Sequence, residues 1–596
     1  MDKRFIFINL LIEVCLILNT IEKKLNLKKR NEFRGLKEEE LSDDIIILHT
    51  NDVHCSIKDS IGYDGLMLYK MELKKKYKHV LTVDAGDHIQ GGAIGLLSRG
   101  LDIMGIMNTI EYDVVIIGNH EFDYGIEQLK ICEEKLNCGY ISANYCYRKN
   151  KTSIFPPYKI IEFDDKKIGF IGITTPQTLT KTNLYHIVDE DGKMIYDFLT
   201  ENEGQELYDT IQRYIDEVKL KGANYIILLC HLGNEGDILE NYKSNSILSH
   251  ISGIDVIIDG HSHSVYNTTS KDKEGKDILL VRTGKKLNNL GVIKIKKDGT
   301  IISEILSKIP RPEYHEFRPD FRNNILRYVD PYMFKILNDI IVSHSDELNE
   351  KYGYVEFDLK IKIDNSRSFS KYISGSEENP LCDLVSDAIR YIGDGDICII
   401  NSGSIRSDLM KGDITFQNIL DILPFYSDII IKEILGKDIL DALEYGVKYL
   451  PTEKSMFPQV SGISFKVNTS KKSPVVVDKD EIFVKVDGER RVYDVMVGNE
   501  PLNISKKYKM SFTDYIGNGG DGYSMFNKYE EALPIFKTDK QALIIYIKEV
   551  LKGIIPDKYR IKQGRIIIDE YKSKMSFSKK KTSKLMPIIL LLLILF

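Results

Sequence analysis

The stretch GNHEFDYG, residues 118–125, decides how the first half of the chain is understood. It follows directly on the apolar run VVII at 114–117, whose β-branched residues are typical of a buried strand. Ligands of α/β sheets bind at the carboxyl ends of strands, so Asn119 and His120 stand where a ligand would lie. Asp123 is close enough in sequence to orient the His120 imidazole. A polar strand-to-helix turn has the same short pattern, so this stretch alone establishes no site.

The same arrangement recurs four more times along the chain. Apolar runs at 45–49, 80–83, 225–230 and 256–260 are each followed by acidic or imidazole side chains. The polar side chains in these stretches include Asn51, Asp52 and His54 after the first run, Asp84, Asp87 and His88 after the second, His231 after the third, and His261 and His263 after the fourth. We therefore expect five strands to deliver them, with Asn119, to one edge of a sheet. A mixed set of oxygen and nitrogen ligands suits Zn²⁺, Mn²⁺ or a similar ion. The set is too large for one ion, and two ions sharing a bridging carboxylate would serve phosphoryl chemistry.

In this order the motifs resemble those of the 5′-nucleotidase family, which belongs to the calcineurin-like metallophosphatases. They read ILHTNDVH (47–54), DAGDHIQGG (84–92), GNHEFDYG (118–125), HLG (231–233) and GHSH (260–263). The resemblance implies two α/β domains joined by a linker helix. The first is a four-layered α/β/β/α metallophosphoesterase domain, and the second is a C-terminal α/β substrate-binding domain.

The resemblance also implies the roles of the residues and two divalent metal ions. One ion would be held by Asp52, His54, Asp87 and His263, and the other by Asp87, Asn119, His231 and His261, with Asp87 as the bridge. His120 would be the catalytic histidine, paired with Asp123. Zinc is the expected metal, with manganese, cobalt and magnesium as alternatives.

The length of the chain, 596 residues, exceeds what one hydrophobic core supports and predicts two large domains. Alternating strand and helix patterns place the catalytic domain at 43–319. An apolar stripe then predicts a linker helix over 330–352, and a second domain runs over 355–569. The net charge of −6 and the lack of a long basic face argue against a nucleic-acid polymer as partner.

Three short motifs stand out in the second domain: NSGSIR (401–406), LPF (423–425) and DYIGNGGDG (514–522). Glycine-rich loops let a backbone approach a ligand, although alone they are more often ordinary turns. They resemble the family motifs N-x-G-x-I-R, L-P-F and N-F-x-x-N-G-G-D-G, with Tyr515 in the place of a phenylalanine. The resemblance implies that Phe425 and Tyr515 sandwich the nucleobase and that Asp521 binds the ribose hydroxyls. Asn401 and Arg406 would hold the nucleoside end.

One departure concerns the substrate clamp. The family usually carries an additional arginine before the helix that contains DLVSDA, residues 383–388. Here the stretch at 374–378 reads SGSEE and holds no arginine. Part of the clamp is therefore in doubt.

Both ends of the chain predict the secretory route. Residues 1–20 begin with basic residues and an apolar run, as in a signal peptide, although Glu13 interrupts the run and a short helix is the alternative. Residues 571–596 give a polar spacer and an apolar terminus too short to span a bilayer, as in a GPI-attachment signal. A short tail anchor is the alternative. We expect a secreted or cell-surface protein, held on the membrane by a lipid anchor.

The sequence thus predicts a 5′-nucleotidase that hydrolyses nucleoside 5′-monophosphates. A UDP-sugar hydrolase, a nucleoside di- or triphosphate hydrolase and a 2′,3′-cyclic nucleotide phosphodiesterase are alternatives on the same scaffold. Asp123 argues against the last, where asparagine is typical. A nucleotide-binding surface protein with weakened catalysis is the alternative from another class. The oligomeric state stays open, with a homodimer as the expected form of any self-association.

Overall fold

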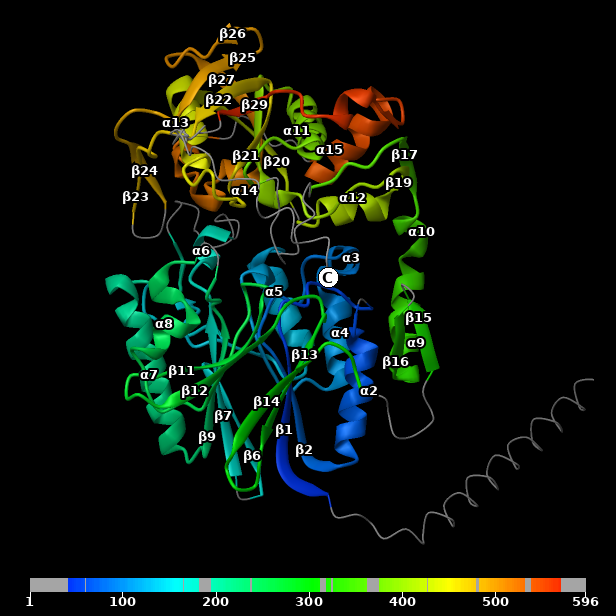
Figure 1. The fold of residues 1–596 in the computed structure, drawn as a ribbon, viewed down its shortest axis with the longest axis vertical. Helices are drawn as coiled ribbons and strands as arrows, with labels where there is room; N and C mark the ends of the chain where they lie inside the picture. Colours follow the sequence, from blue (N-terminus) through cyan, green and yellow to red (C-terminus); the bar gives the residue numbers. More distant parts are fainter. Residues whose placement is uncertain are drawn as a thin grey trace, which may run out of the picture.

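The computed structural model describes residues 41–569, apart from 59, 165, 182–193, 236–237, 311–317, 323–324, 362–374, 426, 479–481 and 531–536. The predicted signal peptide (1–20) and GPI-attachment segment (571–596) lie outside the described residues. Figure 1 shows two bodies stacked along the long axis, with the N-terminal half below and the C-terminal half above. No helix in the described part is long and apolar enough to cross a membrane.

The first domain is built on two six-stranded sheets packed face to face. In the first, the strand order is β14 (Ile301–Leu306), β13 (Leu290–Ile295), β1 (Ser42–Thr50), β2 (Tyr77–Asp84), β3 (Val114–Ile116) and β4 (Tyr140–Ile141). In the second it is β11 (Val265–Lys271), β12 (Asp277–Thr283), β10 (Val256–Ile258), β9 (Tyr225–His231), β7 (Lys166–Thr174) and β6 (Tyr158–Phe163). Apolar side chains of both sheets, such as Ile47, Phe170 and Leu229, form the core between them.

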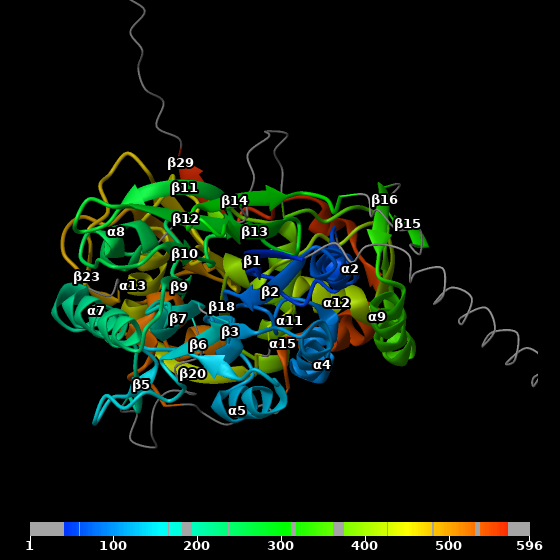
Figure 2. The same ribbon diagram turned by 90° about the horizontal axis from the view of Figure 1, so that it is seen from below.

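Helices cover the two outer faces, which completes four α/β/β/α layers as expected (Figures 1 and 2). The first sheet is covered by α2 (Gly62–Lys74), α4 (Leu101–Ile110) and α5 (Ile126–Lys135), and the second by α7 (Gln205–Leu220) and α8 (Ser244–Leu248). The helix α7 buries Leu207, Ile211 and Ile215, which lie four residues apart on one stripe.

The five strands that precede the candidate ligands do not share one sheet. β1, β2 and β3 are parallel neighbours in the first sheet, whereas β9 and β10 are parallel neighbours in the second. The expectation of a single sheet edge was therefore wrong. All five strands are continuous apolar runs in the interior, and such runs carry no signal of which sheet a strand joins. Because the sheets pack face to face, their carboxyl edges meet and bring the ligands together.

The segment predicted as one linker helix over 330–352 consists of two helices and the start of a strand. Asp330 caps α9 (Pro331–Ser343) by accepting the Met333 N–H at 2.8 Å. The helix breaks at His344, whose Nε2 lies 3.0 Å from Asp102 Oδ2. The short α10 (Ser345–Leu348) follows, and β17 (Lys351–Val355) then pairs with β19 (Gly412–Thr415). Strand pairing thus ends the helical segment earlier than its apolar stripe suggests.

The second domain has a central sheet between two helical layers. Its strand order is β20 (Ile429–Leu435), β27 (Lys507–Thr513), β18 (Ile397–Asn401) and β21 (Pro458–Ser461). Along β18, Cys398 and Ile400 face α11 (Pro380–Gly393) and α15 (Asp539–Ile545), while Ile397 and Ile399 face α13 (Gly436–Gly446). A smaller sheet of β26 (Glu500–Pro501), β25 (Val492–Val497), β22 (Ile463–Asn468) and β29 (Ile566–Asp569) packs beside it.

Two of the three motif loops of the second domain follow strands of its central sheet. NSGSIR begins at the last residue of β18, and α14 (Asp514–Gly517) with the glycine-rich loop follows β27. LPF comes directly after α12 (Phe416–Ile422). In Figure 1, α12 and α14 lie on the side of this domain that faces the first.

Candidate active site

The first group of candidate ligands consists of Asp52, His54 and His263, whose side-chain donor atoms lie within 4.8 Å of one another. His54 Nε2 is 2.9 Å from His263 Nε2, and His263 Nε2 is 3.4 Å from Asp52 Oδ1. His54 Nδ1 lies 2.9 Å from the Gln90 carbonyl. Since a carbonyl only accepts hydrogen bonds, Nδ1 carries the hydrogen and Nε2 directs its lone pair toward the group.

The second group consists of Asp87, His231 and His261, again within 4.8 Å of one another. The Ala85 carbonyl accepts the His231 Nδ1–H at 2.7 Å, so the buried His231 Nε2 points at Asp87 Oδ2, 3.0 Å away. Burial lowers the pKa of His231, but the Asp87 carboxylate outweighs it and raises the pKa to about 10. The space between these two atoms thus favours a positive charge, whether a proton or a metal ion.

Asp87 also faces the first group, because its Oδ2 lies 3.9 Å from His54 Nε2. Asn119, which follows β3, is buried and lines the same pocket as Asp87. The structure therefore brings all seven predicted ligands to one place. Two carboxylates, one amide and four imidazoles, two of them (His54 and His231) with a tautomer fixed by a backbone carbonyl, are a donor set that fits two divalent cations.

Five of the seven predicted ligands have a left-handed backbone, which is uncommon outside glycine. Their φ angles are 50° at Asp52, 48° at His54, 61° at Asp87, 73° at His261 and 56° at His263. Such conformations persist only where the surroundings enforce them, and they cluster at functional sites.

Backbone hydrogen bonds lock the loops that carry these ligands. The Asp52 N–H donates to the Gly86 carbonyl at 3.0 Å, and the His54 N–H donates to the Asp87 carbonyl at 2.9 Å. Gly86 has a φ of +90°, and a Cβ there would lie 2.6 Å from the Gly118 nitrogen. Only glycine fits this crossing, so the loops after β1, β2 and β3 interlock.

Glu121 is a supporting residue that the sequence reasoning missed. Its buried carboxylate accepts the backbone N–H groups of Asp87 at 2.9 Å, His88 at 2.8 Å and Gly118 at 2.6 Å. It thereby ties the loop after β2 to the loop after β3. Its position between His120 and Asp123 is the only signal in the sequence, because a carboxylate that binds backbone N–H groups carries no motif of its own.

The predicted catalytic pair lies beside the second group. His120 Nδ1 is 2.7 Å from Asp123 Oδ2, and the His120 N–H donates to Asp87 Oδ1 at 2.9 Å. Burial lowers the pKa of His120, but Asp123 and Asp87 outweigh it and raise the pKa above its ordinary value. The pair can therefore hold a proton and direct Nε2 at an anionic group.

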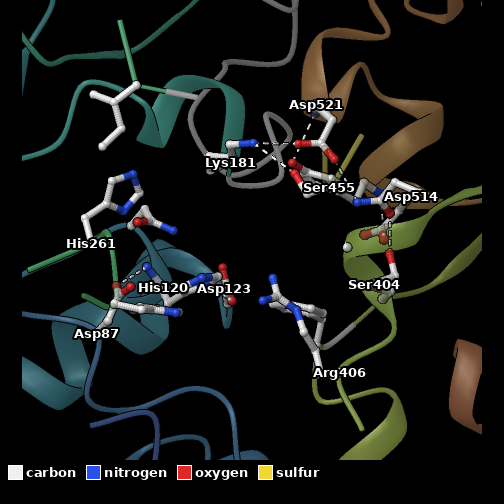
Figure 3. A pocket seen from close by; sticks show the side chains of 18 of the residues that line it. Asp87, His120, Asp123, Lys181, His261, Ser404, Arg406, Ser455, Asp514 and Asp521 are labelled. Atoms are coloured by element: carbon white, nitrogen blue, oxygen red, sulfur yellow. Dashed lines mark hydrogen bonds and ion pairs between the residues drawn. The ribbon is translucent and has the colours of Figure 1, made fainter. Parts of the chain in front are cut away.

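A single pocket joins this centre to the second domain, and Figure 3 shows side chains from both domains around it. From the first domain it is lined by Asp87, Asn119, His120, Asp123, His261 and His263, and from the second by Asn401, Arg406, Phe425, Tyr515 and Asp521. Asp52, His54 and His231 are buried and do not line it.

Inside this pocket, Phe425 of the second domain contacts His120 of the first domain. Its ring centroid is 5.7 Å from that of His120, and the Arg406 guanidinium carbon lies 4.8 Å above its ring. The Asn401 amide donates to Asp521 Oδ2 at 2.8 Å. Lys181 also lines the pocket, although it lies in no motif that pointed to it.

The stretch that lacks the family arginine bonds within its own domain. The Gly375 carbonyl accepts the Lys454 N–H at 3.0 Å, and Glu378 accepts the Ile566 N–H at 3.0 Å. Over the part of the chain that the structure describes, Arg406 is the only arginine that lines the pocket.

Comparisons with known proteins agree with this architecture. The family model for calcineurin-like phosphoesterase matches residues 45–265, and that for the 5′-nucleotidase C-terminal domain matches 359–528. The human 5′-nucleotidase is 26% identical over 81% of this chain and 84% of its own length. The trifunctional nucleotide phosphoesterase protein YfkN of Bacillus subtilis is 24% identical over 86% of this chain, which spans only 34% of that protein.

The fold has a solved counterpart in the crystal structure of a 5′-nucleotidase precursor from Thermus thermophilus. The TM-score is 0.67 with 23% identity, over 88% of this chain and 99% of that one. The two family models match the chain in the order of its two domains, first the phosphoesterase domain and then the C-terminal domain. Together with a donor set that fits two divalent ions, they assign the family. The chain belongs to the 5′-nucleotidase family of calcineurin-like phosphoesterases and is a metal-dependent phosphoric monoester hydrolase.

Proposed function

We propose that the chain hydrolyses nucleoside 5′-monophosphates to nucleoside and phosphate. One observation carries the proposal: a single pocket is lined at one end by the predicted ligands Asp87, Asn119, His261 and His263, and at the other by Phe425, Tyr515 and Asp521. A phosphate bound beside Asp87 therefore leaves its nucleoside in the second domain. The lining is mostly charged and polar, with the aromatic rings of Phe425 and Tyr515 among these groups, which suits a ligand that has both an anionic and an aromatic part.

Asp52, His54, Asp87 and His263 would hold one divalent ion, and Asp87, Asn119, His231 and His261 the other. Zinc is the metal we propose, because imidazole and carboxylate sets suit it. When bound, the ions supply Lewis-acid stabilisation of phosphate oxygens and a water of lowered pKa.

Side chains of the first domain supply the other contributions to the reaction at the phosphoryl group. His120, held at Nδ1 by Asp123, presents Nε2 to an oxygen on which negative charge develops, and an imidazolium there stabilises that charge. Asp87 keeps the His120 backbone in place through Oδ1. Asn119 adds a neutral amide next to the phosphate.

The second domain would bind the nucleoside. The rings of Phe425 and Tyr515 stack on the base, and Asp521 accepts hydrogen bonds from the ribose hydroxyls. Arg406, above the face of Phe425, supports that ring and places a positive charge near the phosphate end. Stacking tolerates different bases, so we expect all common nucleoside monophosphates to be substrates.

The experiment is a phosphate-release panel on the purified chain with added Zn²⁺ or Mn²⁺. The substrates are AMP, CMP, ADP, UDP-glucose, 2′,3′-cyclic AMP and p-nitrophenyl phosphate. We expect AMP and CMP to have the highest kcat/KM. Faster turnover of ADP, UDP-glucose or the cyclic nucleotide would replace the proposal with that activity. Binding of AMP without release from any substrate would indicate a nucleotide-binding protein.

We also propose that the mature protein is held at the cell surface by a GPI anchor. The support is the polar spacer and apolar terminus of residues 571–596. Phosphatidylinositol-specific phospholipase C should release the protein from intact cells. Retention on the membrane with the C-terminal peptide still present would indicate a tail anchor instead.

A further inference from the structure

The catalytic domain reaches across the pocket to the second domain through the short helix α6 (Thr178–Lys181). Lys181 Nζ lies 2.9 Å from Asp521 Oδ1 and 3.4 Å from Ser455 Oγ. Figure 3 shows Lys181 on the opposite side of the pocket from Arg406, with its ammonium directed at Asp521. One residue of the first domain thus contacts the carboxylate proposed to bind ribose.

A second contact crosses the same boundary one residue earlier. The Tyr515 hydroxyl donates to the Thr180 carbonyl at 2.9 Å and accepts the Asp521 N–H at 3.1 Å. A phenol has one hydrogen to donate and lone pairs to accept with, so a single hydroxyl makes both bonds. Tyr515 occupies the position where the related motif has phenylalanine, so this hydroxyl is an addition that base stacking does not require.

Asp521 depends on these neighbours. Only 2% of its side chain is exposed, and its backbone is left-handed with a φ of 52°. A buried carboxylate is costly unless it is paired and hydrogen-bonded. Lys181 supplies the opposite charge at Oδ1, Asn401 donates to Oδ2, and Tyr515 fixes the backbone N–H. Of these supports Lys181 comes from the first domain, and the Tyr515 hydroxyl is itself bonded to the first domain at the Thr180 carbonyl.

We propose that Thr180, Lys181, Tyr515 and Asp521 form an interdomain clasp that positions Asp521 and the Tyr515 ring for the nucleoside. The inference rests on the proposed function, because it assigns Asp521 to ribose. In the clasp, Lys181 and the Tyr515 hydroxyl are positioning groups. They place the ribose acceptor only when the two domains are together, so nucleoside recognition is tied to the arrangement of the domains.

The test uses the full chain with Tyr515→Phe and Lys181→Met, each of which keeps most of the side-chain volume. Loss of the neutral hydroxyl should raise the KM for AMP about three- to tenfold, and loss of the charged partner about tenfold or more. For Lys181→Met, the kcat for AMP and the turnover of p-nitrophenyl phosphate, which has no ribose, should stay near wild type. Lys181→Met should also shrink the preference for AMP over 2′-deoxy-AMP.

Matched controls are Tyr493→Phe, whose hydroxyl contacts Asp569, and Lys471→Met, which pairs with Glu489. Both lie in the second domain, and both should leave every kinetic constant unchanged. Because the two clasp variants act through Asp521, their effects on KM should combine to less than the product of the single effects. Full multiplicativity would indicate two independent contacts and would overturn the clasp.

A readout apart from activity separates this inference from the proposed function. Tyr515→Phe removes the acceptor of the Asp521 N–H, so hydrogen–deuterium exchange of the peptide 515–523 should accelerate in the free protein. Unchanged exchange together with a wild-type KM would overturn the clasp, as would an equal loss on p-nitrophenyl phosphate. A wild-type chain inactive on AMP would refute the proposed function, and the exchange result would still decide whether the clasp exists.

Discussion

The two ends of the pocket are built in different ways. At the metal end, the candidate ligands come from five strands of one domain and are held by interlocked backbone loops and the buried Glu121. At the nucleoside end, three contacts bring the two domains together. They are the Phe425 ring beside His120, the Lys181–Asp521 ion pair, and the Tyr515 hydroxyl on the Thr180 carbonyl. The first end is fixed within one folded unit, whereas the second exists only where two units meet. Damage to the first should therefore abolish chemistry, and damage to the second should weaken selection.

The largest expected effect comes from Asp87→Asn, because this carboxylate faces both ligand groups. Mutation of a residue that only contacts a metal ligand typically costs about ten- to a hundredfold in metal affinity or activity. Because Asp87 is itself a predicted ligand, we expect a loss of at least about a hundredfold in kcat on AMP and p-nitrophenyl phosphate alike. Bound metal, measured by elemental analysis, should fall with it. The matched control Asp277→Asn changes an exposed residue of β12 and should be silent. Two bound ions with normal turnover would refute the dinuclear assignment.

His120→Ala should follow, with both substrates again affected because they share the phosphoryl group. Removing one group that stabilises transition-state charge costs about a hundred- to a thousandfold in kcat. Bound metal should remain, since His120 belongs to neither ligand group. His250→Ala, at an exposed histidine far along the chain, is the control. A rise in KM with unchanged kcat would move His120 from catalysis to binding.

Phe425→Ala tests the nucleoside end. Loss of one stacking face should cost about 1–3 kcal/mol, which raises the KM for AMP roughly five- to a hundredfold. The contact between Phe425 and His120 sharpens this expectation, because an aromatic pair is worth about 0.5–1.5 kcal/mol. Turnover of p-nitrophenyl phosphate should therefore fall too, but by less. Equal losses on both substrates would contradict the assignment of chemistry to the metal end and of substrate selection to the nucleoside end.

The smallest effect is expected from Glu121→Gln. The amide oxygen of glutamine can still accept part of the backbone N–H bonds, but the negative charge that favours them is lost. We expect a loss of about tenfold in metal affinity, measured by titrating the metal-free protein, with a parallel loss of activity on both substrates. Glu127→Gln, an exposed neighbour in α5, is the control. Unchanged metal affinity would show that the loops hold without this carboxylate.

The location of the metal end could be predicted because its signal is local, whereas the choice of Asp87 over its neighbours Asp84 and His88 came from the motif resemblance. Each candidate ligand directly follows an apolar run, and a strand end fixes where the next few side chains lie. How the strands divide between two sheets was not predictable, because β1 and β9 are equally apolar and an apolar run does not indicate which strand it pairs with. The end of the helical segment before Lys351 was hidden for a similar reason, since it coincides with strand pairing to the distant β19.

The nucleoside end could be predicted only through motif resemblance. Asn401, Arg406, Phe425, Tyr515 and Asp521 do line one pocket, but no pattern within the sequence links them to His120. Lys181 escaped because a lone lysine on a short helix has no periodicity or spacing that marks it. Contacts between domains depend on tertiary arrangement, which local patterns do not encode.

The interlocked loops after β1 and β2 bear on which metal the protein acquires in a cell. Their positions are set by backbone bonds such as Asp52 N–H to Gly86 O, so folding alone fixes the spacing of the donor atoms. A mixed set of nitrogen and oxygen donors binds several first-row ions in their general order of affinity, so metal availability contributes to which ion is bound. The composition of the compartment in which the chain folds would then decide its metal content. We expect batches produced in zinc-rich and manganese-rich media to share one thermal-unfolding profile when metal-free and to differ in turnover as isolated.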